Sequence, residues 1–295
     1  MTRQLSSAKA NAAAATAALL FGASVVAVQI AVRDVPPLTL AFLRFGQGTM
    51  LLAAGLALFR RDLFHVARRD LPYLALLGVI FYTIFPVSFN AGLQYLPASQ
   101  ASLLLATTPL WTLLLARAVT RERLATRQIV GVIVSISGVA IVMTDRGLGQ
   151  VSVIGVLLLI TTALSGAIYN VLAKRALAKY NGVTVTFYAM LAGSLLLMPS
   201  LVGSHLNLLS RETLALVAFL GVLGGAVAFT LWTVALRRLS PTEVAVYINL
   251  NPIAASLLAA AMLGERLTPA FVVGFVAVAA GVLIVNWTGW RRQPE

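Results

Sequence analysis

The sequence predicts an all-α integral membrane protein with ten transmembrane helices in a 5+5 inverted-topology repeat and both termini in the cytoplasm. Three observations predict this fold: the chain is very apolar, its apolar stretches have membrane-spanning length, and its second half repeats its first. Of the 295 residues, 60% are hydrophobic and 11% are charged, and the mean hydropathy is +0.93. A soluble domain is nearer half apolar and a quarter charged, so we expect most of this chain to lie in lipid.

Ten apolar stretches have about the 20 residues that a helix needs to cross the hydrocarbon core. They are residues 10–32, 37–59, 71–94, 97–118, 127–144, 153–174, 183–203, 212–236, 242–263 and 269–288. The first stretch is preceded by Arg3 and Lys9, as in a signal peptide, but it is too long for a typical apolar core of one and further spans follow it. Connections such as Leu96-Pro97-Ala98 are short, so consecutive helices are expected to be antiparallel neighbours with no extramembrane domain.

The two halves of the chain share a motif at one constant spacing, without a gap. The matched positions are Pro109 and Pro252, Glu122-Arg123-Leu124 and Glu265-Arg266-Leu267, Gly131 and Gly274, and Gly138 and Gly281. A fixed spacing near half the chain length indicates two copies of one structural unit. We therefore expect five-helix repeats at residues 1–147 and 148–295, which together form one membrane domain.

Basic residues orient the predicted helices, because cytoplasmic loops of membrane proteins are enriched in lysine and arginine. With both termini inside, the outward loops carry only Arg33, Arg146, Arg211 and Arg266, and the other loop lysines and arginines face inward. Five spans are an odd number, so the second copy must be inverted relative to the first. Inverted repeats are typical of secondary transporters, in which the substrate site lies near the middle of the membrane between the two halves.

The repeated motif resembles that of the drug/metabolite transporter superfamily, in its EamA-type branch. The residues that carry the resemblance are Pro252, Gly264-Glu265-Arg266-Leu267-Thr268, Gly274 and Gly281, with Pro109, Glu122-Arg123-Leu124, Gly131 and Gly138 in the first copy. Arg121 stands where the motif has its glycine, which is a small departure. The resemblance covers essentially the whole chain. It implies a transporter of the bacterial cytoplasmic (inner) membrane.

Within the branch, the chain looks most like bacterial exporters of aromatic and other neutral amino acids. Members also export other metabolites and toxic amines, so these substrates are the alternative. More distant alternatives are a membrane enzyme or a channel. An enzyme would need converging catalytic groups, and His65 and His205 fall in predicted loops on opposite sides. A channel does not require two inverted copies.

Prolines are expected to break two predicted helices near their middles. Pro109 and Pro252 occupy equivalent positions in the two copies, and proline in a helix interior removes a backbone hydrogen bond. One interpretation is a discontinuous helix whose end faces the substrate, and the other is a kink that serves packing alone. Pro86 is a further candidate kink, although its counterpart in the second copy is Phe229.

Polar and aromatic residues within the predicted spans are the candidates for a substrate cavity. They are Ser24, Gln29, Tyr82, Asn90, Thr107, Thr108, Trp111, Tyr169, Asn170, Phe229, Trp232, Tyr247, Asn249 and Asn251. Polar side chains are costly in lipid and usually face the interior of a helix bundle. The alternatives are hydrogen bonds between helices and, for the tryptophans, positions at the membrane interface. The predicted cavity is neutral, amide-rich and aromatic, which suits a small amphipathic solute.

Two charged residues are candidates for substrate binding or ion coupling. Arg44 lies within the second span, where it would either pair with a substrate carboxylate or extend to the outer surface. Glu243 begins the ninth span and is either a proton site or a structural carboxylate at a helix N-terminus. No carboxylate lies in the middle of a span, so both facilitated and proton-coupled transport stay open.

Partners and cofactors follow from the same residues. The expected partners are a small-molecule, amino acid-like substrate and the lipid bilayer; nucleic acid is not expected, since the net charge of +13 is spread over short loops. The glycines at 131, 138, 274 and 281 form small-residue faces, which favour a monomer with tightly packed helices or a homodimer through predicted helices five and ten. The chain has no cysteine, two histidines and no phosphate-binding loop, so we expect no metal, no cofactor and no ATP hydrolysis.

Overall fold

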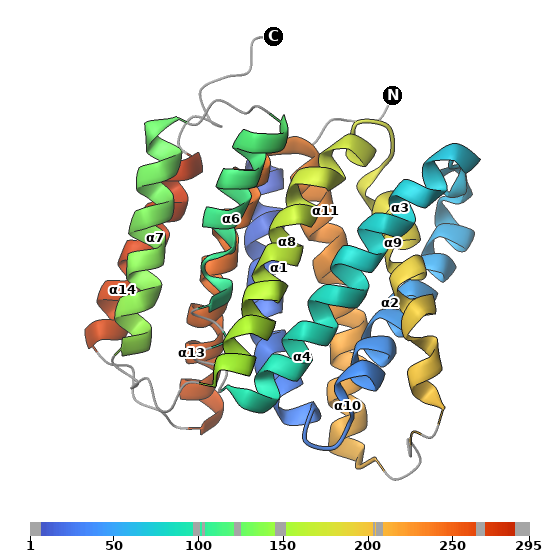
Figure 1. The fold of residues 1–295 in the computed structure, drawn as a ribbon, viewed down its shortest axis with the longest axis horizontal. Helices are drawn as coiled ribbons and strands as arrows, with labels where there is room; N and C mark the ends of the chain where they lie inside the picture. The colour runs from blue at the N-terminus through green and yellow to red at the C-terminus, as the bar shows by residue number, and fades with distance from the viewer. Residues whose placement is uncertain are drawn as a thin grey trace.

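The computed structural model describes residues 7–96, 101, 104–120, 125–144, 152–202, 204, 209–263 and 269–286. Every regular element in these ranges is helical (Figure 1). Six helical segments are long and apolar enough to cross a membrane: Ser7–Ala31, Pro37–Phe59, Arg68–Tyr95, Val153–Leu177, Gly182–Leu201 and Arg211–Arg238. Shorter apolar helices lie at Thr108–Val119, Thr126–Ile141 and Val272–Asn286. The motif residues at 121–124 and 264–268 lie outside the described ranges.

The described helices of the first half follow the predicted stretches, and the stretch at residues 97–118 is interrupted. They are α1 (Ser7–Ala31), α2 (Pro37–Phe59), α3 (Leu71–Gly78), the π-helical η3 (Val79–Ile84), α4 (Phe85–Tyr95), α6 (Thr108–Leu115), η4 (Ala116–Thr120) and α7 (Thr126–Thr144). Short 3₁₀ turns η1 (Arg61–Phe64) and η2 (Arg68–Asp70) join α2 to α3. Within the predicted stretch 97–118, the chain makes a turn at Ala106 and Thr107 before α6 begins, close to the break expected at Pro109.

The second half contains the corresponding elements. They are α8 (Val153–Leu177), α9 (Gly182–Leu197), η5 (Met198–Leu201), α10 (Arg211–Gly221), the π-helical η7 (Val222–Val227), α11 (Ala228–Arg238), α12 (Pro241–Ala245), the 3₁₀ segment η8 (Val246–Leu250), α13 (Asn251–Leu263) and α14 (Pro269–Asn286). The predicted helix over 242–263 is therefore interrupted by a tighter 3₁₀ segment before Asn251. The π-helical segments η3 and η7 occupy equivalent positions of the two copies, so the spacing seen in the sequence recurs in the backbone.

Side-chain caps fix where several helices begin. Ser152, Asn181 and Ser210 each accept a hydrogen bond from a backbone N–H in the first turn of α8, α9 and α10. Such caps satisfy donors that have no partner within the helix. In α12 the Ser240 hydroxyl and the Glu243 carboxylate form a reciprocal capping box. Helix boundaries are thus set locally, by residues at the ends of apolar stretches.

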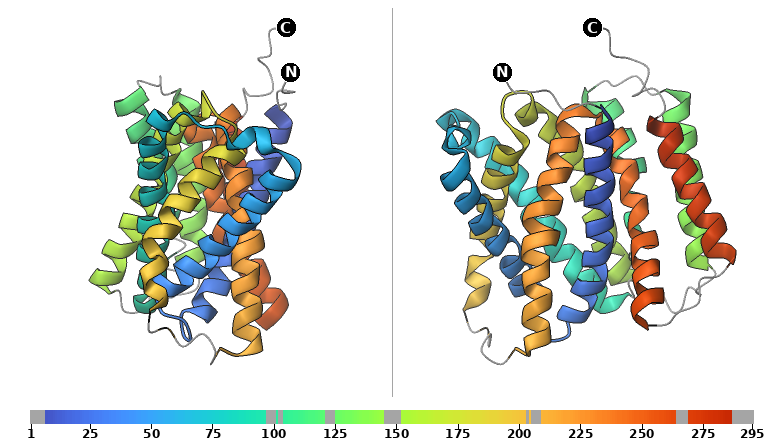
Figure 2. Two further views of the ribbon diagram at one scale, coloured as in Figure 1. Left: turned by 90° about the vertical axis from the view of Figure 1, so that its right-hand side faces the viewer. Right: turned by 180° about the vertical axis from the view of Figure 1, so that it is seen from behind.

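The two halves of the chain pack into one another rather than side by side. Helix α1 packs against α11 and α13 of the second half, and α8 packs in the same way against α4 and α6 of the first. Likewise α2 contacts α10 and η7, while α9 contacts α3 and η3. Figure 2 shows α1 between α11 and α13, with the start of α1 and the end of α14 at the same end of the molecule. Each of these contacts thus has a counterpart, which the equivalent helices of the opposite halves form.

Helices α7 and α14 form a separate pair at one edge of the molecule (Figure 1). Their glycines face one another: a Cβ added at Gly138 would lie 2.7 Å from the Gly274 carbonyl oxygen, and one added at Gly281 would lie 2.6 Å from the Gly131 carbonyl oxygen. The small-residue faces therefore cover each other within one chain. A homodimer through these helices would have to use their outer faces, where Ile133 and Val276 are exposed.

We predict that Gly138→Val destabilises the protein, because the side chain cannot enter the α7–α14 contact without displacing backbone. Overpacking of this kind costs about 1–3 kcal/mol. The unfolding midpoint of the detergent-solubilised variant should fall by several degrees. Gly55→Val is the matched control, since nothing lies within 4 Å of a Cβ added at Gly55. Equal midpoints for the two variants would contradict this account of the helix pair.

Candidate functional site

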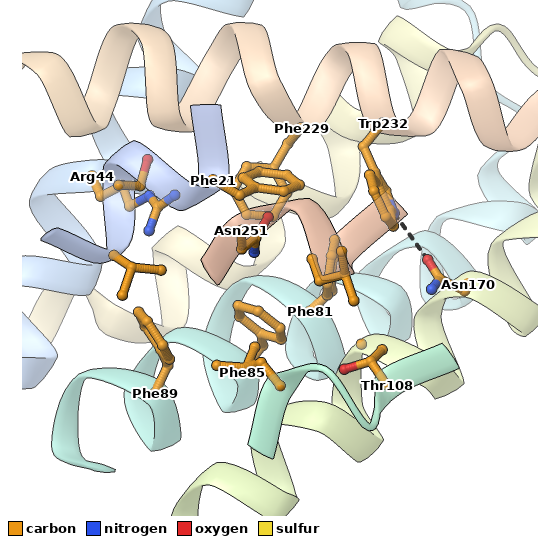
Figure 3. Close-up of a pocket in the computed structure, with 15 residues that line it drawn as sticks. Phe21, Arg44, Phe81, Phe85, Phe89, Thr108, Asn170, Phe229, Trp232 and Asn251 are labelled. Atoms are coloured by element: carbon orange, nitrogen blue, oxygen red, sulfur yellow. Dashed lines mark hydrogen bonds between the residues drawn. The ribbon is translucent and has the colours of Figure 1, made fainter. Parts of the chain in front are cut away.

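A cavity lies between the two halves of the chain and holds about 560 Å³ of space between atoms, part of it open to solvent. The side chains that line it are Phe21, Ser24, Val25, Arg44, Phe81, Phe85, Phe89, Leu105, Thr108, Gly166, Asn170, Phe229, Trp232, Ile248 and Asn251 (Figure 3). Both halves contribute, so any movement of one half against the other changes the shape of the cavity.

Equivalent positions of the two halves face the cavity together. Leu105 and Ile248 both line it, as do Thr108 and Asn251 and also Phe89 and Trp232, and each pair has the constant spacing of the repeat. Thr108 and Asn251 are the first residues of α6 and α13. Two helix N-termini, one from each half, therefore meet the cavity at matching positions, where the backbone is interrupted.

The prolines of the repeat start helices rather than kinking them in the middle. Pro109 and Pro252 are the second residues of α6 and α13, where a backbone N–H has no partner within the helix and its loss costs little. The break expected near the middle of each predicted stretch therefore lies directly before its proline. Pro86 is the second residue of α4, directly after the π-helical η3. The equivalent η7 precedes Phe229 without a proline, so the π segment does not depend on one.

Aromatic rings form most of the cavity wall. The Phe229 ring lies 4.7 Å from that of Phe21 and 5.2 Å from that of Phe81, measured between centroids. Phe81 is stacked on Tyr169 at 4.0 Å, which places Tyr169 behind the wall. These tilted and edge-to-face contacts are favourable for aromatic pairs and hold the rings in place. This aromatic part of the wall is suited to a flat or aliphatic side chain.

Polar groups occur at a few points of this wall. The Trp232 indole N–H donates to the Asn170 side-chain oxygen at 2.9 Å. With its amide turned so that the nitrogen faces two carbonyls, Asn251 donates to Ala18 at 2.7 Å and to Ile248 at 3.3 Å. The Thr108 hydroxyl has no hydrogen-bond partner among the described residues. The amides are therefore held by the protein, while the Thr108 hydroxyl has an unused donor and acceptor.

Arg44 is the charged residue of the cavity wall. Its side chain is 5% exposed, and its Nη2 donates to the Gly224 carbonyl at 2.8 Å. The guanidinium carbon lies 5.2 Å from the centroid of Phe45 and 5.4 Å from that of Phe229, in cation–π contact. The expectation that Arg44 extends to the outer surface is therefore wrong, because the glycines of η7 leave room for the guanidinium inside the protein.

The structure brings seven of the predicted site residues to the cavity and places the others in helix packing. Those at the cavity are Ser24, Arg44, Thr108, Asn170, Phe229, Trp232 and Asn251. Those elsewhere are Gln29, Tyr82, Asn90, Thr107, Trp111, Tyr169, Tyr247, Asn249 and Glu243. Gln29 is half-buried near the end of α1, and Tyr82 is fully buried behind the aromatic wall.

Hydrogen bonds show what most of these outlying residues do. Asn90 donates to the Pro37 carbonyl, Asn249 to the Ser135 hydroxyl and Tyr247 to the Asn11 side chain, so each joins two helices. Tyr169 and Thr233 share a hydrogen bond in the same way. The Trp111 indole donates to the hydroxyl of Thr107, in the turn directly before its own helix α6. Glu243 caps α12 through Ser240 and does not line the cavity.

Sequence reasoning missed the apolar half of the wall. Phe21, Val25, Phe81, Phe85, Phe89, Leu105, Gly166 and Ile248 line the cavity but were not predicted. A search for polar residues in apolar spans does not find them. The repeat does contain part of the signal, since Phe89 is the equivalent of Trp232, and Leu105 and Ile248 are equivalents of each other.

Comparison with known proteins gives a family and several relatives. The family described as "EamA-like transporter family" matches residues 8–144 and 153–287. A probable terminal-alkyne amino-acid exporter of Streptantibioticus cattleyicolor is 32% identical and covers 88% of this chain and 86% of its own. A probable amino-acid metabolite efflux pump of Escherichia coli is 28% identical, and the match covers 93% of this chain and 94% of the pump. An uncharacterized transporter of Archaeoglobus fulgidus is 28% identical, and the match covers 90% of this chain and 94% of that transporter.

A solved crystal structure shares the fold. It superposes with a TM-score of 0.79 at 21% sequence identity and covers 96% of this chain and 98% of that one.

Thiol labelling tests the cavity wall, because the chain has no native cysteine. We expect Thr108→Cys to react with a small methanethiosulfonate reagent at least about tenfold faster than Thr112→Cys, since thiols react only where reagent has access. Thr112 is one turn away on α6, is 0% exposed and does not line the cavity. Rates measured by mass spectrometry would contradict the assignment if the Thr112→Cys variant reacted as fast.

Proposed function

The chain belongs to the EamA-like transporter family, whose match covers nearly all of it, and we propose that it is a secondary transporter that exports small amphipathic metabolites, namely aromatic and other neutral amino acids. The observation that carries the proposal is the cavity lined by equivalent residues of both halves. Supporting it are relatives named as a probable amino-acid exporter and a probable amino-acid metabolite efflux pump. These names describe the relatives, and the substrate of this chain is inferred from its own cavity.

The proposed topology has ten spans in two inverted five-helix repeats, at residues 1–147 and 148–295, in the bacterial cytoplasmic membrane. The exchange of contacts between the halves supports this topology. The start of α1 and the end of α14 lie at one end of the molecule, where α2 ends near Arg60 and Arg61 (Figures 1 and 2). Clustered arginines mark the cytoplasmic side, so both termini are proposed to be cytoplasmic.

Transport would proceed by alternating access, in which the halves rock about the central cavity. Polar contacts link the halves at many places away from the cavity, and two of these contacts involve residues that the repeat makes equivalent. Asp70 accepts hydrogen bonds from the Tyr180 hydroxyl at 2.5 Å and from Lys179 at 3.0 Å. The Thr213 hydroxyl donates to Asp34 at 2.6 Å, and Thr213 is the repeat equivalent of Asp70. Asp70 and Thr213, which are equivalent positions, thus each hold a contact between the halves, and two inverted copies would use such contacts to close opposite sides.

The cavity favours an amphipathic solute over an organic cation. Its wall combines aromatic rings with the positive charge of Arg44. The described carboxylates, Asp34, Asp62, Asp70, Glu212 and Glu243, do not line it. A toxic amine would therefore meet a like charge, whereas the apolar part of an amino acid would meet the rings. The absence of a described carboxylate from the wall also supports facilitated transport over coupling through Glu243, which already caps a helix.

Flux through proteoliposomes tests the function. We expect the purified protein to give saturable uptake of labelled phenylalanine or tryptophan, with or without an imposed pH gradient. Saturable flux that requires the gradient would contradict facilitated transport. Absence of amino-acid flux in both conditions would contradict the proposed substrate class.

We expect Trp232→Ala and Asn251→Ala each to lower this flux by about tenfold or more while insertion into the membrane stays intact. Losing the contact of a buried aromatic ring costs about 1.5–3 kcal/mol, and about 1.4 kcal/mol is a factor of ten. Trp111→Ala is the matched control, because Trp111 does not line the cavity and its indole bonds to the turn directly before its own helix. Normal flux in the Trp232 and Asn251 variants would contradict the assignment of the cavity as the substrate site.

A further inference from the structure

We propose that Arg44 binds the carboxylate of the transported solute and thereby selects carboxylate-bearing solutes over amines of the same shape. The inference rests on the proposed transport function and names the chemical group that the cavity recognises. It is carried by three observations: where Arg44 lies, which of its hydrogen-bonding groups are unused, and what surrounds the rest of the cavity.

Arg44 is held in place by contacts that leave its charge uncompensated. Nη2 donates to the Gly224 carbonyl, and two aromatic rings flank the guanidinium. Among the described residues, no carboxylate lies within 4 Å of Arg44, and Nε has no hydrogen-bond partner. A buried charge without a counter-ion is costly, so retaining one at a cavity wall indicates a charged ligand.

The contacts of Arg44 also fix its orientation. Gly224 belongs to the π-helical η7, and no side chain would fit at this position, because a Cβ at Gly224 would overlap the Ser24 hydroxyl. The carbonyl contact and the ring contacts together restrict the planar guanidinium to one position. A preorganised guanidinium loses little entropy when it binds a carboxylate, and its donors match the two oxygens of that group.

The remainder of the cavity fits the other part of such a solute. In Figure 3, Arg44 lies at one end of the cavity, with Trp232 and Asn170 at the other and the rings of Phe81 and Phe85 between them. An anionic group at Arg44 would therefore direct an apolar side chain along the aromatic wall. The ligand class is a small carboxylic acid with an apolar body, of which neutral amino acids are one case.

Binding of matched probes to the detergent-solubilised full chain tests the proposal. The probes are 3-phenylpropionate and 3-phenylpropylamine, which share an apolar body and carry opposite charges, with L-phenylalanine as a third. Calorimetric titration should show the wild type binding 3-phenylpropionate about 10- to 100-fold more tightly than 3-phenylpropylamine, as expected for a charge-assisted pair. Arg44→Gln should remove this preference.

Two further variants separate recognition from folding. Arg44→Lys keeps the charge but loses the planar guanidinium, so it should still prefer 3-phenylpropionate, with weaker binding. This variant replaces Arg44→Gln in the test if Arg44→Gln does not fold. Arg61→Gln removes an exposed arginine that bonds to the Ala57 carbonyl and should bind like the wild type. Equal binding of the two probes to the wild type, no binding of either, or an unchanged preference in a folded Arg44→Gln variant would each overturn the proposal.

Flux distinguishes failure of this inference from failure of the transport proposal. Proteoliposome flux of phenylalanine without a carboxylate preference in binding would overturn the role of Arg44 and leave transport standing. An Arg44-dependent preference in binding without flux of any probe would support the carboxylate site and contradict transport of this solute class.

Discussion

Inside a bilayer the backbone has no water to bond with, so an interrupted helix is stable only where it is buried in protein or lines a cavity. This constraint organises the structure. The turn before α6 and the 3₁₀ segment before α13 both occur beside the central cavity, at equivalent positions of the two halves. The continuous helices α1 and α8 pack against these interrupted elements and enclose the cavity. The irregular backbone and the cavity therefore depend on each other.

Glycine and π-helical geometry also make room for a charged side chain beside the cavity. The wider turn of η7 presents the Gly224 carbonyl to Arg44, so a guanidinium is accommodated within an apolar bundle. Away from the cavity, the glycines of α7 and α14 let the two helices come close together, and they do not position a charged side chain. Small residues thus serve packing at the edge of the molecule and placement of a charge at its centre.

Much of the helical architecture was predictable because it depends on local signals. Apolar length, capping residues such as Ser240 and the spacing of Pro109 and Pro252 are all visible in one sequence. The breaks before α6 and α13 lie just upstream of Pro109 and Pro252, because each proline takes the second position of the new helix. The matched π segments carry no residue signature, because one is followed by Pro86 and the other by Phe229.

The site was predictable mainly in its polar part, together with the aromatic residues Phe229 and Trp232. Asn170, Trp232 and Asn251 reach the cavity, but Asn90, Asn249 and Tyr247 are equally polar and serve as bonds between helices. Whether a buried amide lines the cavity or bonds to another helix depends on which helix lies opposite it, and that is a property of the tertiary fold. Apart from Phe229 and Trp232, the aromatic residues of the wall were missed for the same reason, since phenylalanine in an apolar span looks alike whether it faces lipid, another helix or a cavity.

Distances between spin labels at two equivalent pairs of positions test the central claim, that inverted repeats alternate about one cavity. The pairs are Arg69 with Lys179 and Pro36 with Glu212, which the constant spacing of the repeat relates to each other. The account predicts that saturating solute shortens one distance while lengthening the other, in reconstituted protein measured by double electron–electron resonance. Distances that change together, or that do not respond to a solute that is transported, would contradict it.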